Sequence, residues 1–304
     1  MWQVHAYSAP FPTQCVHRNG RRAVFSPNIV AVDAAKITKQ SKSNLALAFV
    51  SLGKERRRDI TTFYAFCRVI DDIADSPDLD PRTKAEGLSA WRSWLRGAAA
   101  NESSLAPEVR ALMAKYRLAP EMLEEIIAGV EMDLSQSRYA SFEELGLYCY
   151  RVASAVGLVS IEIFGYRNRE CREYAIQLGL ALQTTNIIRD VGKDLEVGRI
   201  YLPQEEMTRF RYSEADLLAR RYNDRFLALM DFQAKRSHAF YARAAAVLPR
   251  EDRRAMVAAE IMAGVYRSLL RRMEADHFRV FGKAYRLSRL HKAGWVAARL
   301  LRPF

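Results

Sequence analysis

Residues 183–194 read Gln-Thr-Thr-Asn-Ile-Ile-Arg-Asp-Val-Gly-Lys-Asp. On a helix, Asn186, Asp190 and Asp194 lie one turn apart on the same face, and Gln183 lies one turn before them. Apolar residues accompany these polar ones, which is typical of a buried helix that carries a polar stripe. Two carboxylates one turn apart repel each other, and a hard cation such as Mg²⁺ offsets that repulsion.

A second acidic cluster lies earlier in the chain. Residues 71–75 read Asp-Asp-Ile-Ala-Asp and end a long helical run, with Asp71 and Asp75 again four positions apart. Arg68 and Arg189 stand close upstream of the two clusters. Carboxylates hold Mg²⁺, Mg²⁺ shares phosphate oxygens, and arginine neutralises the phosphate charge that remains. The two clusters together indicate a metal–diphosphate site, and the alternative for each pair alone is a solvated helix face.

The remaining sequence is helical in pattern after a lead-in over residues 1–27 that contains Pro and Gly. The alternating β-branched stretches that are typical of strands are nearly absent. Ser141 and Glu144 form a capping box before an apolar run, and Pro120 suits the first turn of a helix. Since no internal repeat or linker is apparent, the sequence predicts one all-α domain over residues 28–304.

The composition excludes several classes of protein. Half of the 304 residues are hydrophobic and 27% are charged, which predicts a packed core. Cysteines and histidines lack the spacing of zinc sites, and the glycine-rich loops of nucleotide-binding proteins are absent. No run of about 18 apolar residues and no signal-peptide pattern is found, so we expect a cytoplasmic protein.

The positive charge is concentrated near the C-terminus. The formal net charge is +12, and residues 250–304 contain thirteen Lys or Arg against five Asp or Glu. Such a chain attracts nucleic acid, anionic lipid or a phosphorylated small molecule. A nucleic-acid-binding helical protein is the least favoured, because no such module is visible and the acid pairs would have no role. For the C-terminal charge, including Trp295, the alternatives are peripheral association with an anionic membrane surface and an ordinary solvated helix.

Several stretches resemble the squalene and phytoene synthase family. Residues 64–75 (Tyr-Ala-Phe-Cys-Arg-Val-Ile-Asp-Asp-Ile-Ala-Asp) look like its first aspartate-rich motif, and residues 183–203 look like its second. Residues 148–157, 41–49 and 280–290 resemble a further conserved block, the substrate flap and the C-terminal tail of the family. The resemblance extends over roughly residues 28–300.

The resemblance implies an isoprenoid-synthase helical bundle with a central cavity, and a prenyltransferase that uses Mg²⁺, or Mn²⁺, to join two allylic diphosphates head to head. By motif, the metal ligands would be Asp71, Asp72, Asp75, Asn186, Asp190 and Asp194. Catalytic roles would fall to Asp71, Asp75, Tyr150, Gln183, Asn186, Asp190 and Asp194. Substrate and diphosphate would be bound by Ser43, Asn44, Tyr64, Arg68, Arg151, Arg189, Arg199 and Tyr201. Tyr64, Tyr150 and the apolar stretch 152–165 would line the cavity.

Two positions depart from the family pattern. Lys193 replaces an acid of the second motif, and either points to solvent or offers an extra diphosphate contact. Arg151 replaces the tyrosine that is usual in eukaryotic squalene synthases, which puts a requirement for NADPH in doubt. We expect farnesyl diphosphate as substrate and a presqualene diphosphate or squalene-type C30 product. The main alternative is a phytoene synthase that acts on two geranylgeranyl diphosphates, and lesser ones are a terpene cyclase and a non-catalytic relative.

Overall fold

The structure, a computed structural model, describes residues 48–97, 101–288, 291 and 294–298. Every regular element in this part of the chain is a helix, and no strand occurs in it. The predicted all-α fold class is therefore confirmed. Ser43, Asn44 and the lead-in over residues 1–27 lie outside the described residues.

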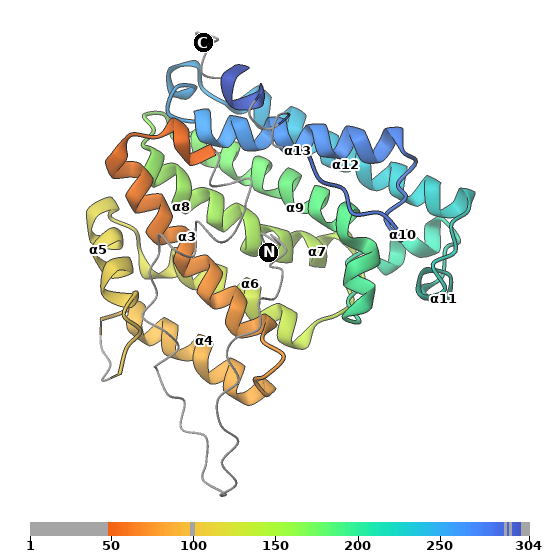
Figure 1. Ribbon diagram of the computed structural model, residues 1–304, viewed down its shortest axis with the longest axis horizontal. Helices are drawn as coiled ribbons and strands as arrows, with labels where there is room; N and C mark the ends of the chain where they lie inside the picture. Colours follow the sequence, from red (N-terminus) through yellow and green to blue (C-terminus); the bar gives the residue numbers. More distant parts are fainter. Residues whose placement is uncertain (1–47, 98–100, 289–290, 292–293, 299–304) are drawn as a thin grey trace, which may run out of the picture.

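The long helices lie side by side in one slanting array (Figure 1), with α4 and α5 toward one end and α10 and α11 toward the other. In chain order the elements are η1 (Phe49–Ser51), α3 (Lys54–Asp75), α4 (Pro81–Leu95), α5 (Ala106–Tyr116), α6 (Pro120–Ser135), α7 (Phe142–Cys149), η2 (Tyr150–Ser154), α8 (Ala155–Phe164), α9 (Cys171–Glu196), α10 (Gln204–Arg209), α11 (Glu214–Leu218), α12 (Asp224–Val247), η3 (Arg250–Asp252) and α13 (Val257–Ala275).

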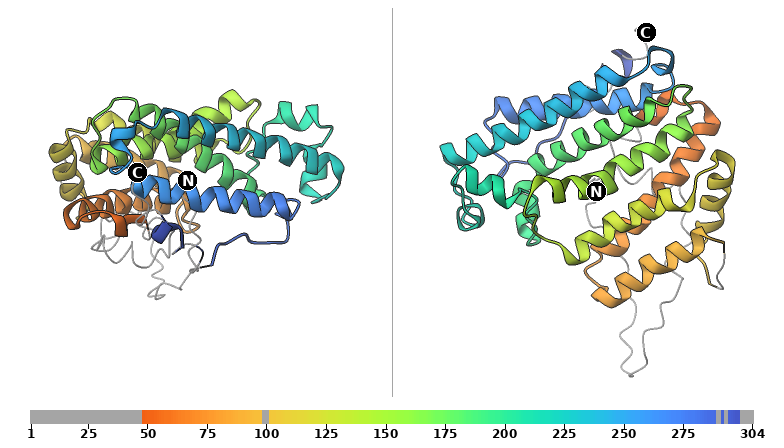
Figure 2. Two further views of the ribbon diagram at one scale, coloured as in Figure 1. Left: turned by 90° about the horizontal axis from the view of Figure 1, so that it is seen from above. Right: turned by 180° about the vertical axis from the view of Figure 1, so that it is seen from behind.

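Helix α9 is the central element of the bundle. It packs chiefly against α12 and also contacts η2, α8, α13 and α7. Gly179 allows the closest of these approaches, because a Cβ atom at this position would lie 2.5 Å from Cα of Ser154 in η2. Helix α3 packs on the other side of the bundle against α4, α5, α6 and α8. The views from above and from behind show the same arrangement (Figure 2).

The predicted helix starts agree with the structure. The Ser141 side chain accepts a hydrogen bond from the Glu144 N–H, and α7 begins at the next residue. Glu144 Oε2 in turn accepts from the N–H of Ala140, one residue before the cap. Helix α6 begins at Pro120, whose missing N–H costs nothing in a first turn. Local sequence signals therefore determine these boundaries.

Helix α7, the π-helical turn η2 and helix α8 form one continuous stretch, Phe142–Phe164. Among the described residues, this stretch is long and apolar enough to cross a membrane. However, 67% of its most apolar window is buried inside the protein, as in a core helix. π-Helical turns often occur at functional sites, because they rotate the side chains on either side of them.

Trp295, in the basic C-terminal segment, is half-buried. The Trp295 ring lies against Gly264 of α13, where a Cβ atom would be 2.4 Å from the ring. Its indole N–H also donates a hydrogen bond of 2.9 Å to Ser268 Oγ. Because the absence of a side chain at Gly264 leaves room for the ring, this aromatic residue packs onto the bundle.

Candidate active site

Acidic side chains from three helices converge in one polar region. Asp71 and Asp75 lie in the last turns of α3, and Asp190 and Asp194 lie in the last turns of α9. Asp133, near the end of α6, is close enough for its charge to raise the pKa of both Asp71 and Asp194. Asp133 therefore lies close enough to interact with acids of both predicted pairs.

Asp133, which is not among the predicted site residues, is the centre of a buried hydrogen-bond network that includes the predicted diphosphate ligands Arg199 and Tyr201. Tyr201 donates to Asp133 Oδ1 at 2.7 Å, and Tyr148 donates to Oδ2 at 3.2 Å. Arg199 lies beside them, with one nitrogen 3.5 Å from the Asp133 main-chain oxygen and another 3.5 Å from Asp75 Oδ1. Burial raises the pKa of Asp133, although Arg199 and the hydrogen bond from Tyr201 oppose that rise. This network links α3, α6, α7 and the segment that follows α9.

A sequence signal for Asp133 exists. Asp133 follows Val130 by three positions and Ile126 by seven, so it continues the buried stripe of α6. An acid on an otherwise apolar face is a candidate functional residue, because burying a carboxylate without a partner is costly.

Tyr148, and not Tyr150, reaches the acidic region. Tyr148 is 1% exposed and contacts Asp133, whereas Tyr150 is half-buried at the start of η2 and is not among the residues that line the apolar cavity described below. Two residues apart on a helix lie on nearly opposite faces, which explains the difference. Arg151 likewise faces α6, where its Nε atom lies 3.1 Å from Glu125 Oε2. No contact in the described structure joins Tyr150 or Arg151 to the acidic cluster.

The second acid pair is closely accompanied by cations. Arg189 donates to both oxygens of Asp190, to Oδ1 at 2.9 Å and also to Oδ2. The ammonium of Lys193 lies 3.6 Å from Asp190 Oδ1. Asp190 is only 2% exposed, so both cations interact with it in a poorly solvated setting. Burial raises the pKa of Asp194 well above its usual range, and the charge of Asp190 acts in the same direction.

The first acid pair has a different environment. Burial raises the pKa of Asp71 to about 7, and the charges of Asp75 and Asp133 act in the same direction. No ion pair within the described part of the chain involves Asp71. The predicted diphosphate ligand Arg68 instead pairs with the predicted metal ligand Asp72 at 2.6 Å, on the more exposed side of α3.

The oxygen donors of the site suit a hard divalent cation. Asn186 Nδ2 donates to Gln183 Oε1 at 3.3 Å, and both side chains are buried. Asn186 Oδ1 is buried with no hydrogen-bond partner among the described residues, which is costly unless another group binds it. Nowhere in residues 48–97 and 101–288 do three His, Cys, Asp or Glu side chains form a complete ligand set. Mg²⁺ commonly binds one or two carboxylates together with phosphate oxygens and water, so these donors fit it.

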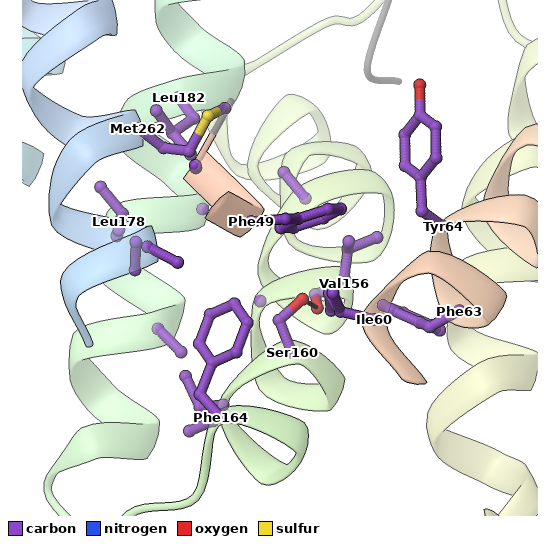
Figure 3. A pocket seen from close by; sticks show the side chains of 18 of the residues that line it. Phe49, Ile60, Phe63, Tyr64, Val156, Ser160, Phe164, Leu178, Leu182 and Met262 are labelled. Atoms are coloured by element: carbon purple, nitrogen blue, oxygen red, sulfur yellow. Dashed lines mark hydrogen bonds between the residues drawn. The ribbon is translucent and has the colours of Figure 1, made fainter. Parts of the chain in front are cut away.

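An apolar cavity is lined by residues of α3, α8, α9 and α13 (Figure 3). Its lining includes Cys67, one turn before Asp71, and Leu182, next to Gln183. The lining residues are almost all apolar: Ala48, Phe49, Ile60, Phe63, Tyr64, Cys67, Ala153, Val156, Gly157, Ser160, Ile161, Phe164, Tyr174, Ala175, Leu178, Gly179, Leu182, Ala258, Ala259 and Met262. The predicted cavity residue Tyr64 and much of the stretch 152–165 are among them.

Known proteins share both the sequence and the fold of this chain. The family model described as squalene/phytoene synthase matches residues 38–291. A 15-cis-phytoene synthase from Synechococcus elongatus is 34% identical over 286 residues, which cover 89% of this chain and 92% of that protein. A phytoene synthase from Mycobacterium tuberculosis is 35% identical over 271 residues, covering 87% and 88% of the two chains.

The fold of this chain also matches solved structures of proteins with related names. A crystal structure of a dehydrosqualene synthase has a TM-score of 0.77 at 26% identity, covering 88% of this chain and 94% of that one. The squalene synthase HpnC from Alicyclobacillus acidocaldarius shares the fold, with a TM-score of 0.72 at 23% identity and coverage of 81% and 93%. The family resemblance and the fold predicted from the motifs are thereby confirmed. The chain belongs to the squalene/phytoene synthase family, whose members are prenyltransferases that condense prenyl diphosphates head to head.

Proposed function

We propose that this protein joins two molecules of geranylgeranyl diphosphate head to head and releases a C40 hydrocarbon of the phytoene type. The observation that carries the proposal is the convergence of two acid pairs around Asp133, next to an apolar cavity. The sequence motifs alone favour farnesyl diphosphate and a C30 product. The relatives with the names phytoene synthase support the alternative instead, so we adopt the C20 substrate.

Family members generally use a divalent metal ion. In this chain Asp71, Asp75, Asn186, Asp190 and Asp194 would hold Mg²⁺, and their all-oxygen donor set supports this choice. When bound, the metal stabilises the negative charge on the departing diphosphate.

The protein's own side chains orient the diphosphate end of the substrate. Arg199, between Asp75 and Asp133, can compensate diphosphate charge that the metal leaves unbalanced. Burial raises the pKa of Tyr148 and Tyr201 well above the usual value, so both hydroxyls keep their protons at neutral pH. With Asp133 accepting from both, the two hydroxyls are fixed in position beside the reacting centre.

The apolar cavity protects the reacting carbon. Loss of diphosphate from an allylic substrate generates a carbocation, which water would quench. The polar atoms of the lining are few and internally bonded, as with Ser160 Oγ, which donates to the Val156 main-chain oxygen at 2.7 Å. Such a lining accommodates prenyl chains and excludes water, so that the second prenyl double bond is the nucleophile available to the cation.

The atom balance of the proposed reaction needs no reductant. Two C–O bonds break and release two diphosphates, new carbon–carbon bonds join the chains, and two protons leave to give the central double bond of the C40 hydrocarbon. A saturated link between the chains, as in squalene, would require a hydride in place of one lost proton. NADPH is therefore not part of the proposed cofactor set.

The test is product analysis by mass spectrometry after incubation of the purified protein with geranylgeranyl or farnesyl diphosphate and Mg²⁺, with and without NADPH. We expect a C40 hydrocarbon from the C20 substrate without NADPH. A clear preference for farnesyl diphosphate with a C30 product would restore the squalene-type interpretation. A cyclic C15 or C20 hydrocarbon would overturn head-to-head condensation.

We also propose that the protein is cytoplasmic and contacts anionic membrane surfaces peripherally. Exposed arginines near the end of the bundle, such as Arg271, Arg272 and Arg286, support this, as does the poor solubility of a C40 product in water. Flotation with anionic and zwitterionic liposomes tests it. Equal binding to both types of vesicle would contradict an electrostatic contact.

A further inference from the structure

Lys193 is the residue of the site whose role the family pattern leaves open. Its side chain is 33% exposed, so it does not simply extend into solvent. Its ammonium lies 3.6 Å from Asp190 Oδ1, and Asp194 and Glu196 also attract it. A lysine on the turn between two paired aspartates is thus directed toward the acid pair itself.

The charges around this ammonium are of both signs. Arg189 already binds both carboxylate oxygens of Asp190. Arg286, from the segment that follows α13, is close enough to act electrostatically on Lys193. That segment is fixed on α9 at Gly192, where a Cβ atom would lie 2.5 Å from the Val280 main-chain oxygen. The fold therefore places Arg189 and Lys193 at Asp190, with the charge of Arg286 acting on Lys193.

We propose that Lys193 is a built-in counter-ion of the second acid pair, which lowers the affinity of that pair for divalent metal and binds diphosphate directly. This inference rests on the proposed function, since it assigns a task at the same metal–diphosphate site. In the metal-free site the ammonium neutralises part of the charge that attracts a divalent ion to Asp190. When diphosphate arrives, the same ammonium is a ready ligand for its oxygens.

The size of the effect follows from electrostatics. A unit positive charge about 4 Å from a carboxylate in a partly buried site weakens the attraction of that carboxylate for a metal ion. The effect is large enough to change the metal dissociation constant roughly 10-fold or more. Removing the lysine charge should therefore tighten metal binding at Asp190 and weaken diphosphate binding. Loss of a residue that only supports the helix would instead weaken the binding of both metal and diphosphate.

The experiment measures Mn²⁺ binding by the loss of the free-ion signal in electron paramagnetic resonance, on the whole chain without substrate. The variants are Lys193→Gln and Lys193→Glu, and Lys193→Arg is the control that keeps the charge. Lys235→Gln is the matched control, because Lys235 pairs with Asp231 at 2.6 Å on an exposed part of α12. A second titration measures binding of inorganic diphosphate at saturating Mn²⁺.

We expect the dissociation constant for Mn²⁺ to fall roughly 10-fold in Lys193→Gln, further in Lys193→Glu, and not at all in Lys193→Arg or Lys235→Gln. Diphosphate binding should weaken in Lys193→Gln. If Lys193→Gln binds Mn²⁺ no more tightly than the wild type, the counter-ion role is refuted while the proposed function stands. If the wild type binds neither Mn²⁺ nor diphosphate, or if Asp71→Asn and Asp190→Asn leave Mn²⁺ binding unchanged, the proposed function itself fails.

Discussion

The acid pairs of α3 and α9 have the same spacing in the sequence, but the first aspartate of each pair has a different environment in the fold. Asp71 of the first pair makes no ion pair in the described structure, and burial raises its pKa to about 7. Asp190 of the second pair is held between Arg189 and Lys193. The residues that surround an aspartate thus decide whether it is already paired with a cation. The four-residue spacing of the acids alone does not reveal this.

A third carboxylate connects the two pairs. Asp133 interacts electrostatically with acids of both helices and anchors Tyr148 and Tyr201. The two pairs are therefore expected to act as one unit. Substitutions at the acids, at Asp133 and in the cavity can test whether the two pairs act as one unit.

The largest effect is expected from removing one acid of each pair. Asp71→Asn and Asp190→Asn should each lower the rate of diphosphate release roughly 100- to 1000-fold, because each removes charge that stabilises the leaving group. The double variant should cost much less than the product of the two single effects, since the acids serve one event. Full additivity in a diphosphate-release assay would mean that the pairs act independently.

A smaller loss is expected at Asp133. Asp133→Asn keeps the shape but places an amide N–H₂ where a hydroxyl now donates, so one of the two tyrosines loses its acceptor. We expect the turnover rate to fall roughly 10-fold, with an unfolding free energy lower by about 1–3 kcal/mol. Tyr201→Phe is the companion variant. Wild-type turnover in both variants would show that the network does not position the site.

A substitution in the cavity should change the use of substrate without changing metal binding at the acids. Ser160→Leu places a larger side chain into the apolar lining, and should lower kcat/KM for the C20 substrate roughly 10-fold, with a smaller effect on the C15 substrate. Mn²⁺ binding should not change, because Ser160 is not part of the acid cluster. A parallel loss of Mn²⁺ binding would indicate that the variant disturbs the whole fold.

The smallest effect concerns the pH dependence of stability without metal. The pKa of Asp71 in the folded protein, about 7, is higher than in the unfolded chain, so its contribution is complete at low pH and is lost as pH rises through 7. The melting temperature of the metal-free protein should therefore rise by about 2–4 °C between pH 8 and pH 6. Asp71→Asn should flatten this dependence in a thermal melt. An identical slope in the variant would contradict the raised pKa of Asp71.

Local signals in the sequence are sufficient to predict the helical fold, several helix starts and the two acid pairs. The helix starts at Pro120 and Phe142 follow from backbone chemistry within a few residues, and the acid pairs follow from helical periodicity. Helical periodicity places Asp133 on the buried face of α6, but it cannot identify the hydrogen-bond partners of Asp133, which lie 15 and 68 positions away in the chain. The π-helical turn that begins at Tyr150 and the packing of Trp295 on α13 likewise depend on tertiary contacts.

The central claim is that both acid pairs serve one head-to-head condensation of two prenyl diphosphates. The most direct measurement is the molar ratio of diphosphate released to C40 hydrocarbon formed from geranylgeranyl diphosphate and Mg²⁺ without NADPH. The proposed reaction predicts a ratio of about two, because each product molecule requires the loss of two leaving groups. Diphosphate release accompanied only by C20 products, at one diphosphate for each, would contradict the claim.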